Sequence, residues 1–391
     1  MNELHAILDN WRKAIDENQD AVLATVVHVT GSAYRRPGAR MLMLPDGTRV
    51  GSISGGCLEG DVSQKAWWLT EDNKPALRVY DTMSEEDIVW EFGLGCNGII
   101  QVLLERLGTG SARAAMEFLE QCRAAKTDAV VCTVIRANGA GAPEVGDRLF
   151  VVSGQVQGGT LAGSPAEAAL LSHCERTALE RRGRLARLEN CEVFVEWAGQ
   201  PLPLVIIGAG HDAIPLVNIA KQIGWHVTVA DGRPAYAKAS RFPTADRVVH
   251  IRPDDTLESL EIGPRTAVVL MTHNYPQDGK LLKRILPKSP RYLGLLGPKA
   301  RTTRLFKELD LAIDEGALNA PVGLDIGADT PETIALSIAA EIQTVISARE
   351  GGMLKLREEP IHAPVIEEGQ SALPEEEHVR FEFGCELTSS N

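Results

Sequence analysis

The feature that most constrains the fold of this chain is an apolar run followed at once by a glycine-containing turn. Leu204–Ile207 has no polar alternation, which is typical of a parallel strand covered on both faces. Gly208–Ala213 follows directly with Gly-x-Gly-x-x-Ala spacing. Between a strand and a helix, such a turn lets the backbone approach a pyrophosphate, and the first N–H groups of the helix favour an anion. The segment therefore predicts a nucleotide site at the start of a βαβ unit.

The rest of this half repeats the same alternation. Helix-length pieces separate four more apolar strands, and a long amphipathic helix over Thr330–Ala348 closes the series. Alternation of this kind indicates a Rossmann-like, doubly wound parallel sheet over residues 201–350. The four strands are His226–Ala230, Arg247–His250, Ala267–Met271 and Tyr292–Leu296.

An acid lies where a dinucleotide-binding unit of this type needs one. Asp231 ends the second strand, 21 residues after Gly210 (231 − 210), and an acid at this place accepts a hydrogen bond from a ribose 2′-hydroxyl, which favours NAD. Arg233 follows two residues later and is suited to a 2′-phosphate, so the choice between NAD and NADP stays open.

Polar residues also follow the later strands of this half. Ligands of open α/β sheets bind at the carboxyl ends of the strands, so these residues are candidate ligand contacts. His273 is suited to act as an acid/base or to donate a hydrogen bond to a phosphate, and Lys299 is suited to neutralise a phosphate. The alternative for His273 is a loop histidine that hydrogen-bonds to backbone, and the alternative for Lys299 is a solvated helix face. For Asp325, the alternative is a helix-entry loop. The candidates are His211, His273, Gly297, Lys299 and Asp325, beside Gly208, Gly210 and Asp231.

Residues 1–200 predict a mixed α/β unit, with its motifs between 10 and 105. A helix over the first 18 residues precedes a strand over Ala21–Val29, and Asp46-Gly47 predicts a β-hairpin. The alternating helices and strands of residues 110–200 fit a continuation of this unit. Gly199–Pro203 is the predicted boundary before the second unit.

Two loops of the first half carry residues suited to a metal-bearing or phosphate-bearing ligand. Gly31–Ala39 contains Arg35 and Arg36, and arginine binds phosphate in bidentate fashion. Cys57 precedes a predicted helix, and Cys96 lies in a second glycine-rich loop. Soft thiolates suit molybdenum or sulfur transfer, and a helix N-terminus favours the thiolate. The alternative is that each cysteine is a small buried apolar residue.

Composition excludes several classes of protein. The chain has 391 residues and a net charge of −13, without the basic footprint that nucleic-acid binding needs. No segment approaches the ~20 apolar residues of a membrane-spanning helix, and the start lacks the order of a secretory signal. The seven cysteines show no Cys-x-x-Cys spacing. We therefore expect a cytoplasmic protein with an acidic extension over residues 351–391, which serves solubility or partner docking.

Several motifs, in order along the chain, resemble the XdhC/CoxI family of xanthine dehydrogenase accessory proteins. The resemblance covers about residues 10–105 and 200–350. In the first half it rests on Gly31–Met41 and Gly51–Gly60. In the second half it rests on Gly208–His211, Thr272-His273, Gly294–Gly297, Gly323–Ala328 and Thr330–Glu332.

This resemblance implies a factor that binds molybdenum cofactor (molybdopterin). It also implies that the factor protects the cofactor during sulfuration by a cysteine desulfurase and helps insert it into a xanthine dehydrogenase-type molybdenum hydroxylase. Such a factor is more a chaperone than a catalyst, and Cys57 and Cys96 are then the candidate molybdenum contacts. Two alternatives remain: an NAD(P)-dependent oxidoreductase with His273 as acid/base, and a non-enzymatic scaffold. The oligomeric state, including a homo-oligomer, is left open.

Overall fold

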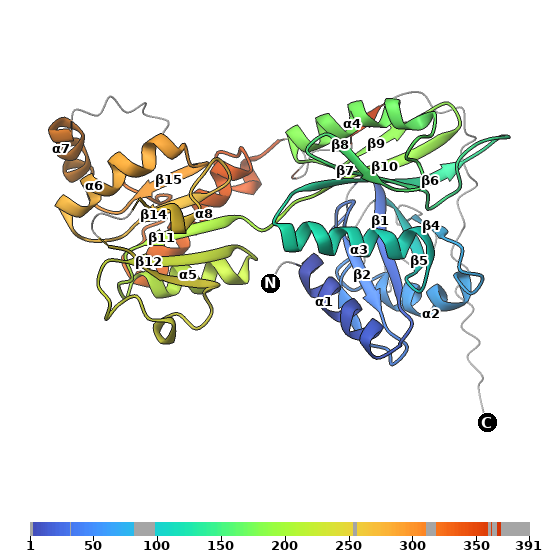
Figure 1. Cartoon of the computed structure of the whole chain (residues 1–391), viewed down its shortest axis with the longest axis horizontal. Coiled ribbons are helices and arrows are strands. Elements are labelled where there is room, and N and C mark those ends of the chain that lie inside the picture. The colour runs from blue at the N-terminus through green and yellow to red at the C-terminus, as the bar shows by residue number, and fades with distance from the viewer. Residues whose placement is uncertain are drawn as a thin grey trace. The chain divides into compact units, whose positions relative to one another are not determined.

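The computed structural model describes residues 3–31, 33–81, 98–252, 256–309, 318–358, 361 and 366–368. The chain forms two compact units (Figure 1). The N-terminal unit contains Glu3–Gln200 and the strand β16 (Ile366–Glu368), and the C-terminal unit contains Pro201–Ile361.

The N-terminal unit begins with an antiparallel five-stranded sheet in the order β3-β2-β1-β5-β4. Side chains alternate across β1, so Val22, Ala24 and Val26 pack on one face with α2, whereas Leu23 packs on the other with α1 and α3. Helices thus cover both faces of this sheet. The elements are α1 (Glu3–Asp16), β1 (Val22–Gly31), β2 (Arg40–Met43), β3 (Arg49–Gly51), α2 (Glu59–Leu69), β4 (Ala76–Asp81), β5 (Gly98–Arg106) and α3 (Gly110–Ala125).

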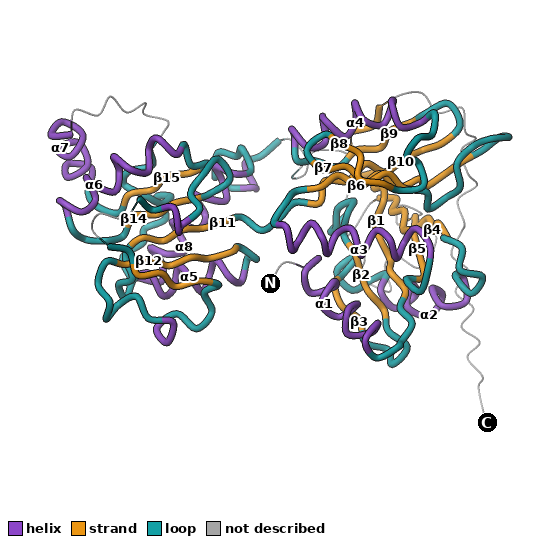
Figure 2. The backbone as a smooth tube through the Cα atoms, in the orientation of Figure 1, coloured by secondary structure: helices purple, strands orange, loops and turns teal. Residues whose placement is uncertain are grey.

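The strands of the middle region do not extend this sheet. They pair among themselves in a second, six-stranded sheet of the same unit, in the order β16-β9-β10-β6-β7-β8. One face packs on α3 and the other on α4, so α3 lies between the two sheets (Figure 2). The elements are β6 (Ala129–Ala137), β7 (Arg148–Val152), β8 (Gln155–Gly158), α4 (Ala166–Glu180), β9 (Arg184–Arg187) and β10 (Cys191–Ala198).

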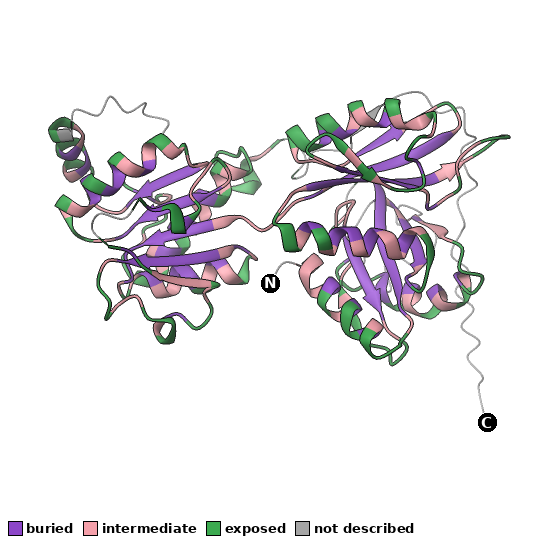
Figure 3. Cartoon of the chain, viewed as in Figure 1, coloured by how far each residue is buried: buried purple, intermediate pink, exposed green. Residues whose placement is uncertain are grey.

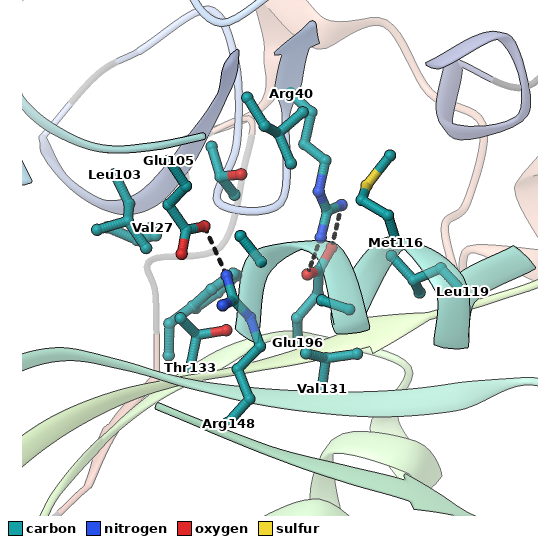
Figure 4. Close-up of a pocket in the computed structure, with 15 residues that line it drawn as sticks. Val27, Arg40, Leu103, Glu105, Met116, Leu119, Val131, Thr133, Arg148 and Glu196 are labelled. Atoms are coloured by element: carbon teal, nitrogen blue, oxygen red, sulfur yellow. Dashed lines mark hydrogen bonds and ion pairs between the residues drawn. The ribbon is translucent and has the colours of Figure 1, made fainter. Parts of the chain in front are cut away.

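Two buried ion pairs join the two sheets of the N-terminal unit (Figure 4). Arg40 on β2 pairs with Glu196 on β10, with 2.7 Å between Nη1 and Oε1. Arg148 on β7 pairs with Glu105 on β5, with 2.5 Å between Nη2 and Oε2. Both pairs line a cavity of about 20 Å³, which has room for one water molecule.

The C-terminal unit is a parallel sheet in the order β13-β12-β11-β14-β15, with its buried residues concentrated on the strands (Figure 3). This is the 3-2-1-4-5 order of a Rossmann-type fold, which confirms the predicted fold class. The strands are β11 (Pro203–Ile207), β12 (His226–Asp231), β13 (Arg247–His250), β14 (Ala267–Leu270) and β15 (Tyr292–Leu295). The helices are α5 (Ala213–Gln222), α6 (Tyr275–Ile285), α7 (Lys299–Leu309) and α8 (Pro331–Ile346).

Four short 3₁₀ helices complete the described elements. They are η1 (Ala239–Arg241), η2 (Glu258–Leu260), η3 (Leu286–Lys288) and η4 (Leu354–Leu356).

Candidate functional site

The turn after β11 has the close backbone packing that its glycines predict. Gly208 has φ +119°, and a Cβ built there would lie 2.3 Å from the backbone oxygen of Met271. Only glycine fits without a shift of the backbone. The end of β11 therefore lies directly against the chain leaving β14, at the point where the strand order reverses and ligands of such sheets bind.

Asp231 lies at this turn but is already engaged. Its Oδ2 accepts hydrogen bonds from Ala209 N (2.7 Å) and Arg233 Nη2 (2.7 Å). Its Oδ1 accepts from Arg233 N (2.8 Å) and Nε (2.9 Å). Burial alone would raise the pKa of this carboxyl, but the hydrogen bonds from Arg233 and Ala209 outweigh it and lower the pKa. Both carboxylate oxygens of Asp231 are therefore already bound, by Arg233 and Ala209.

His273 joins the same edge of the sheet through Asp212. Its Nε2 lies 2.6 Å from Asp212 Oδ2, beside the first turn of α5, and the ring is exposed. Next to it, Thr272 donates to the buried carboxylate of Asp278, which also binds Arg301 Nη2 at 2.6 Å. Burial raises the pKa of Asp278, although Thr272 and Arg301 act in the opposite direction.

The remaining candidates of the C-terminal unit make fewer contacts. Gly297 follows β15 with φ +137° and lies against the Arg301 side chain. Lys299 is exposed at the start of α7, and His211 and Asp325 are exposed in loops. The structure thus brings Gly208, Asp231 and, through Asp212, His273 together.

The loop that carries Cys57 is wrapped around a glutamate. Oε1 of Glu59 accepts from the backbone N–H groups of Ile53, Ser54 and Gly55, at 2.9 to 3.1 Å. Its Oε2 accepts from Gly56 N at 2.9 Å. Cys57 is exposed on this loop, two residues before the start of α2, whereas Cys122, Cys132, Cys174 and Cys191 are buried.

These contacts favour the ionised form of Glu59. Burial would raise its pKa, but the hydroxyl and backbone N–H of Ser54 and the hydroxyl of Ser52 lower the pKa from 4.5 to about 2. Glu59 belongs to the Gly51–Gly60 motif, but its position two residues after Cys57 does not itself reveal this role. The role of Glu59 becomes visible only in the structure, where Ser52–Gly56 turns back onto the start of α2.

The two arginines of the neighbouring loop differ. Arg35 is paired with Glu3 of α1, so its charge is neutralised. Arg36 is partly buried, and burial together with the positive charge of Arg182 lowers the pKa of Arg36. The Tyr34 ring lies against Gly55, where a Cβ would be 2.7 Å from it, so this loop contacts the Cys57 loop.

Arg182 is not a candidate that the sequence reveals, because it lies in the turn between α4 and β9, outside every motif. Its Nη2 is buried and has no hydrogen-bond partner among the described residues. Within the same residues, neither Arg36 nor Arg182 forms an ion pair with a carboxylate. Two partly buried arginines that repel each other and have no carboxylate partner among these residues are suited to bind an anion.

Cys96 lies outside the described residues, so the structure does not place it beside Cys57. Among the residues that are described, there is no group of three or more His, Cys, Asp or Glu side chains arranged to hold a metal ion. None of the helices in this part of the chain is long and apolar enough to span a bilayer.

Comparison with known proteins matches both units. Residues 14–81 match the XdhC and CoxI family, and residues 204–342 match the XdhC Rossmann domain. The chain is 36% identical over 343 residues to a probable xanthine dehydrogenase component of Bacillus subtilis (strain 168), covering 88% of this chain and 97% of that protein.

Two further relatives extend this comparison. The molybdenum cofactor insertion chaperone PaoD of Escherichia coli (strain K12) is 26% identical over 338 residues, with 85% of this chain and 86% of that protein covered. The crystal structure of a xanthine dehydrogenase from Bacillus halodurans superposes with a TM-score of 0.73 at 34% identity, over 88% of this chain and 97% of that one.

The fold and its loops therefore define a two-unit protein with a Rossmann-type second half and a serine- and glycine-rich cysteine loop in the first. The chain belongs to the XdhC and CoxI family.

Proposed function

We propose that this protein is an accessory factor that binds molybdenum cofactor and delivers it to a xanthine dehydrogenase-type molybdenum hydroxylase. Two relatives support this role by their names, one a xanthine dehydrogenase component and the other a molybdenum cofactor insertion chaperone. In the finer form of the proposal, the cofactor is held while a cysteine desulfurase provides its sulfur. The two halves, 1–200 and 201–350, divide cofactor binding and nucleotide binding between them.

One observation carries the proposal. Arg36 and Arg182 pair with no carboxylate of the described chain and repel each other electrostatically, and the loop of Arg36 contacts the loop of Cys57 through Tyr34. Molybdenum cofactor carries a phosphate, sulfur donors and a metal. An arginine pair suits the phosphate, and an exposed thiol suits the metal or its sulfur ligand. The chemical groups of the site therefore fit those of the cargo.

Each residue then has a distinct task. Arg36 and Arg182 bind the phosphate by charge-assisted hydrogen bonds, which also relieves the repulsion between them. Glu59 fixes the loop so that Cys57 stays exposed, and Cys57 contacts the molybdenum end of the cargo. Cys96 is the second proposed thiol contact. Arg35, being neutralised by Glu3, positions its loop rather than binding the phosphate.

The test is the amount of cofactor that co-purifies with the full chain from a molybdate-grown host. We expect Arg36→Ala, Arg182→Ala and Cys57→Ala each to reduce bound pterin and molybdenum at least about tenfold, the loss expected for one charged contact. Arg113→Ala is the matched control, because Arg113 forms an exposed pair with Glu117 on the surface of α3. Unchanged cofactor content in all three variants would contradict the proposed site.

The C-terminal unit is proposed to hold a nucleotide at the Gly208 turn, with Gly210, His211, His273, Gly297, Lys299 and Asp325 around it. The close packing of Gly208 on Met271 supports this, because the turn between β11 and α5 requires glycine where a nucleotide-binding turn of this type has it. If the chain binds nucleotide and transfers hydride to an added acceptor, the oxidoreductase alternative gains support. If it binds partner enzymes but no small molecule, the scaffold alternative does.

A further inference from the structure

Three side chains from the segment after β12 gather at the Gly208 turn. The guanidinium carbon of Arg233 lies 3.8 Å from the centroid of the Tyr236 ring, and that of Arg241 lies 4.6 Å from the same ring. Arg241 Nη1 also donates to the backbone oxygen of Ala209 at 2.8 Å. Stacking on one tyrosine and a bond to the turn hold both arginines beside the nucleotide site.

Asp231 is not available to a ribose at this place. In an NAD-binding unit, the acid at the end of the second strand accepts a hydrogen bond from the ribose 2′-hydroxyl. Here the four lone-pair positions that a carboxylate offers are matched by four hydrogen bonds, from Arg233 and Ala209. The carboxylate is only 4% exposed, whereas the Arg233 side chain is 52% exposed. Arg233, rather than Asp231, is therefore the group presented to a ligand.

The charge of this cluster is positive. Two arginines and one carboxylate give +1 (2 − 1), next to the turn that favours an anion. Arg233 has five N–H donors and uses two of them on Asp231, which leaves three among its contacts in the described chain. A planar guanidinium with free donors, fixed on an aromatic ring, is suited to a phosphate dianion.

We infer that Arg233 and Arg241 bind a phosphate on the ribose of a dinucleotide, so that the C-terminal unit takes an NADP-type ligand in preference to NAD. This inference rests on the proposed nucleotide binding of that unit, and it narrows the choice that the sequence leaves open. The pyrophosphate lies at the Gly208–Gly210 turn, and the 2′-phosphate lies between the exposed guanidinium group of Arg233 and the partly buried one of Arg241.

The test is calorimetric titration of the full chain with NADP⁺ and with NAD⁺, and in parallel with 2′,5′-ADP and 5′-AMP. The wild-type chain is expected to bind each 2′-phosphorylated ligand at least about tenfold more tightly than its counterpart. Arg233→Ala is expected to weaken NADP⁺ binding about tenfold to a hundredfold and to change NAD⁺ binding less than about threefold.

Two further variants keep the test informative. Arg233→Lys keeps a cation beside the buried Asp231, so it serves as the test variant if Arg233→Ala does not fold. It should retain part of the preference for NADP⁺ over NAD⁺. Arg247→Ala removes an equal charge at the start of β13, at the opposite end of the parallel sheet, where Arg247 pairs with Glu261, and should leave both affinities unchanged.

The outcomes separate the two proposals. Equal affinity of the wild-type chain for NADP⁺ and NAD⁺, or an unchanged preference in Arg233→Ala, overturns this inference but leaves nucleotide binding intact. Absence of binding to all four ligands at millimolar concentration overturns both.

Discussion

The carboxylate of Glu196 on β10 accepts hydrogen bonds from both terminal nitrogens of Arg40 on β2, although the two residues are 156 positions apart in the chain. Both side chains are about nine-tenths buried. A Cβ at Gly38, which precedes β2, would lie 3.0 Å from the same carboxylate. This ion pair therefore connects the first sheet, the loop of Arg36 and the second sheet at one point.

Removing Arg40 should destabilise the N-terminal unit strongly. Arg40→Ala leaves the Glu196 charge buried without its partner, and such a loss costs about 3–5 kcal/mol of the free energy of unfolding. Urea unfolding followed by circular dichroism measures this. The double variant Arg40→Leu with Glu196→Leu removes both charges and should recover most of the loss. Equal destabilisation in the single and double variants would show that the charge pair is not the cause.

Glu59 should make the Cys57 loop sensitive to acid. Because its pKa falls from 4.5 in the unfolded chain to about 2 in the fold, its stabilising contribution is complete above about pH 4.5 and is lost as the pH falls towards 2. Glu59→Gln should cost about 2 kcal/mol at pH 7. The difference in unfolding free energy between wild type and variant, measured at pH 7 and pH 3, should shrink at the lower pH. A difference that stays constant would argue against this network.

Gly208 should not tolerate a side chain. In Gly208→Ala, the added Cβ meets the Met271 carbonyl, and the backbone has a φ that alanine rarely adopts. We expect a loss of about 2–3 kcal/mol in unfolding free energy and loss of nucleotide binding. Gly263→Ala, in the same unit, has open space around the new Cβ and is the matched control. Similar behaviour of both variants in thermal unfolding and titration would refute the prediction.

Cys57 should be the most reactive of the described thiols. It is exposed, whereas the other four are enclosed in sheets and helices. In a Cys96→Ala, Cys385→Ala background, one equivalent of thiol should react rapidly with a maleimide, and peptide mapping should locate it at Cys57. The buried thiols should react only in denaturant. Rapid labelling of more than one native thiol in this background would contradict the arrangement.

Much of the C-terminal unit could be predicted from sequence because its strands are short, continuous apolar runs bounded by glycine or polar residues. The predicted strand over Arg247–His250 is confirmed at both ends, and the helix predicted over Thr330–Ala348 is seen as α8, Pro331–Ile346, with Thr330 as its N-cap. Rossmann connections leave little freedom of order, so local pattern determines the sheet.

The fold of the N-terminal unit was harder to predict from sequence, because most of its strands pair antiparallel and over long distances along the chain. Nothing local indicates that β10 pairs with β6 and β9 rather than with β1. The same reason hid Arg182 and Glu196, whose roles depend on partners more than 140 positions away. The turn of the Cys57 loop onto Glu59 was hidden differently: its partners are near in sequence, but a motif of serines and glycines does not specify which carboxylate it encloses.

β16 has a consequence for any shortened form of this protein. Its backbone pairs in parallel with β9 and thereby covers the outer rim of the second sheet. Truncation before Ile366, although it would remove mainly acidic sequence, would leave the hydrogen-bonding groups of β9 open to strands of other molecules. Self-association would then follow from a lost neighbour rather than from lost negative charge, and a cut placed after Glu368 would avoid it.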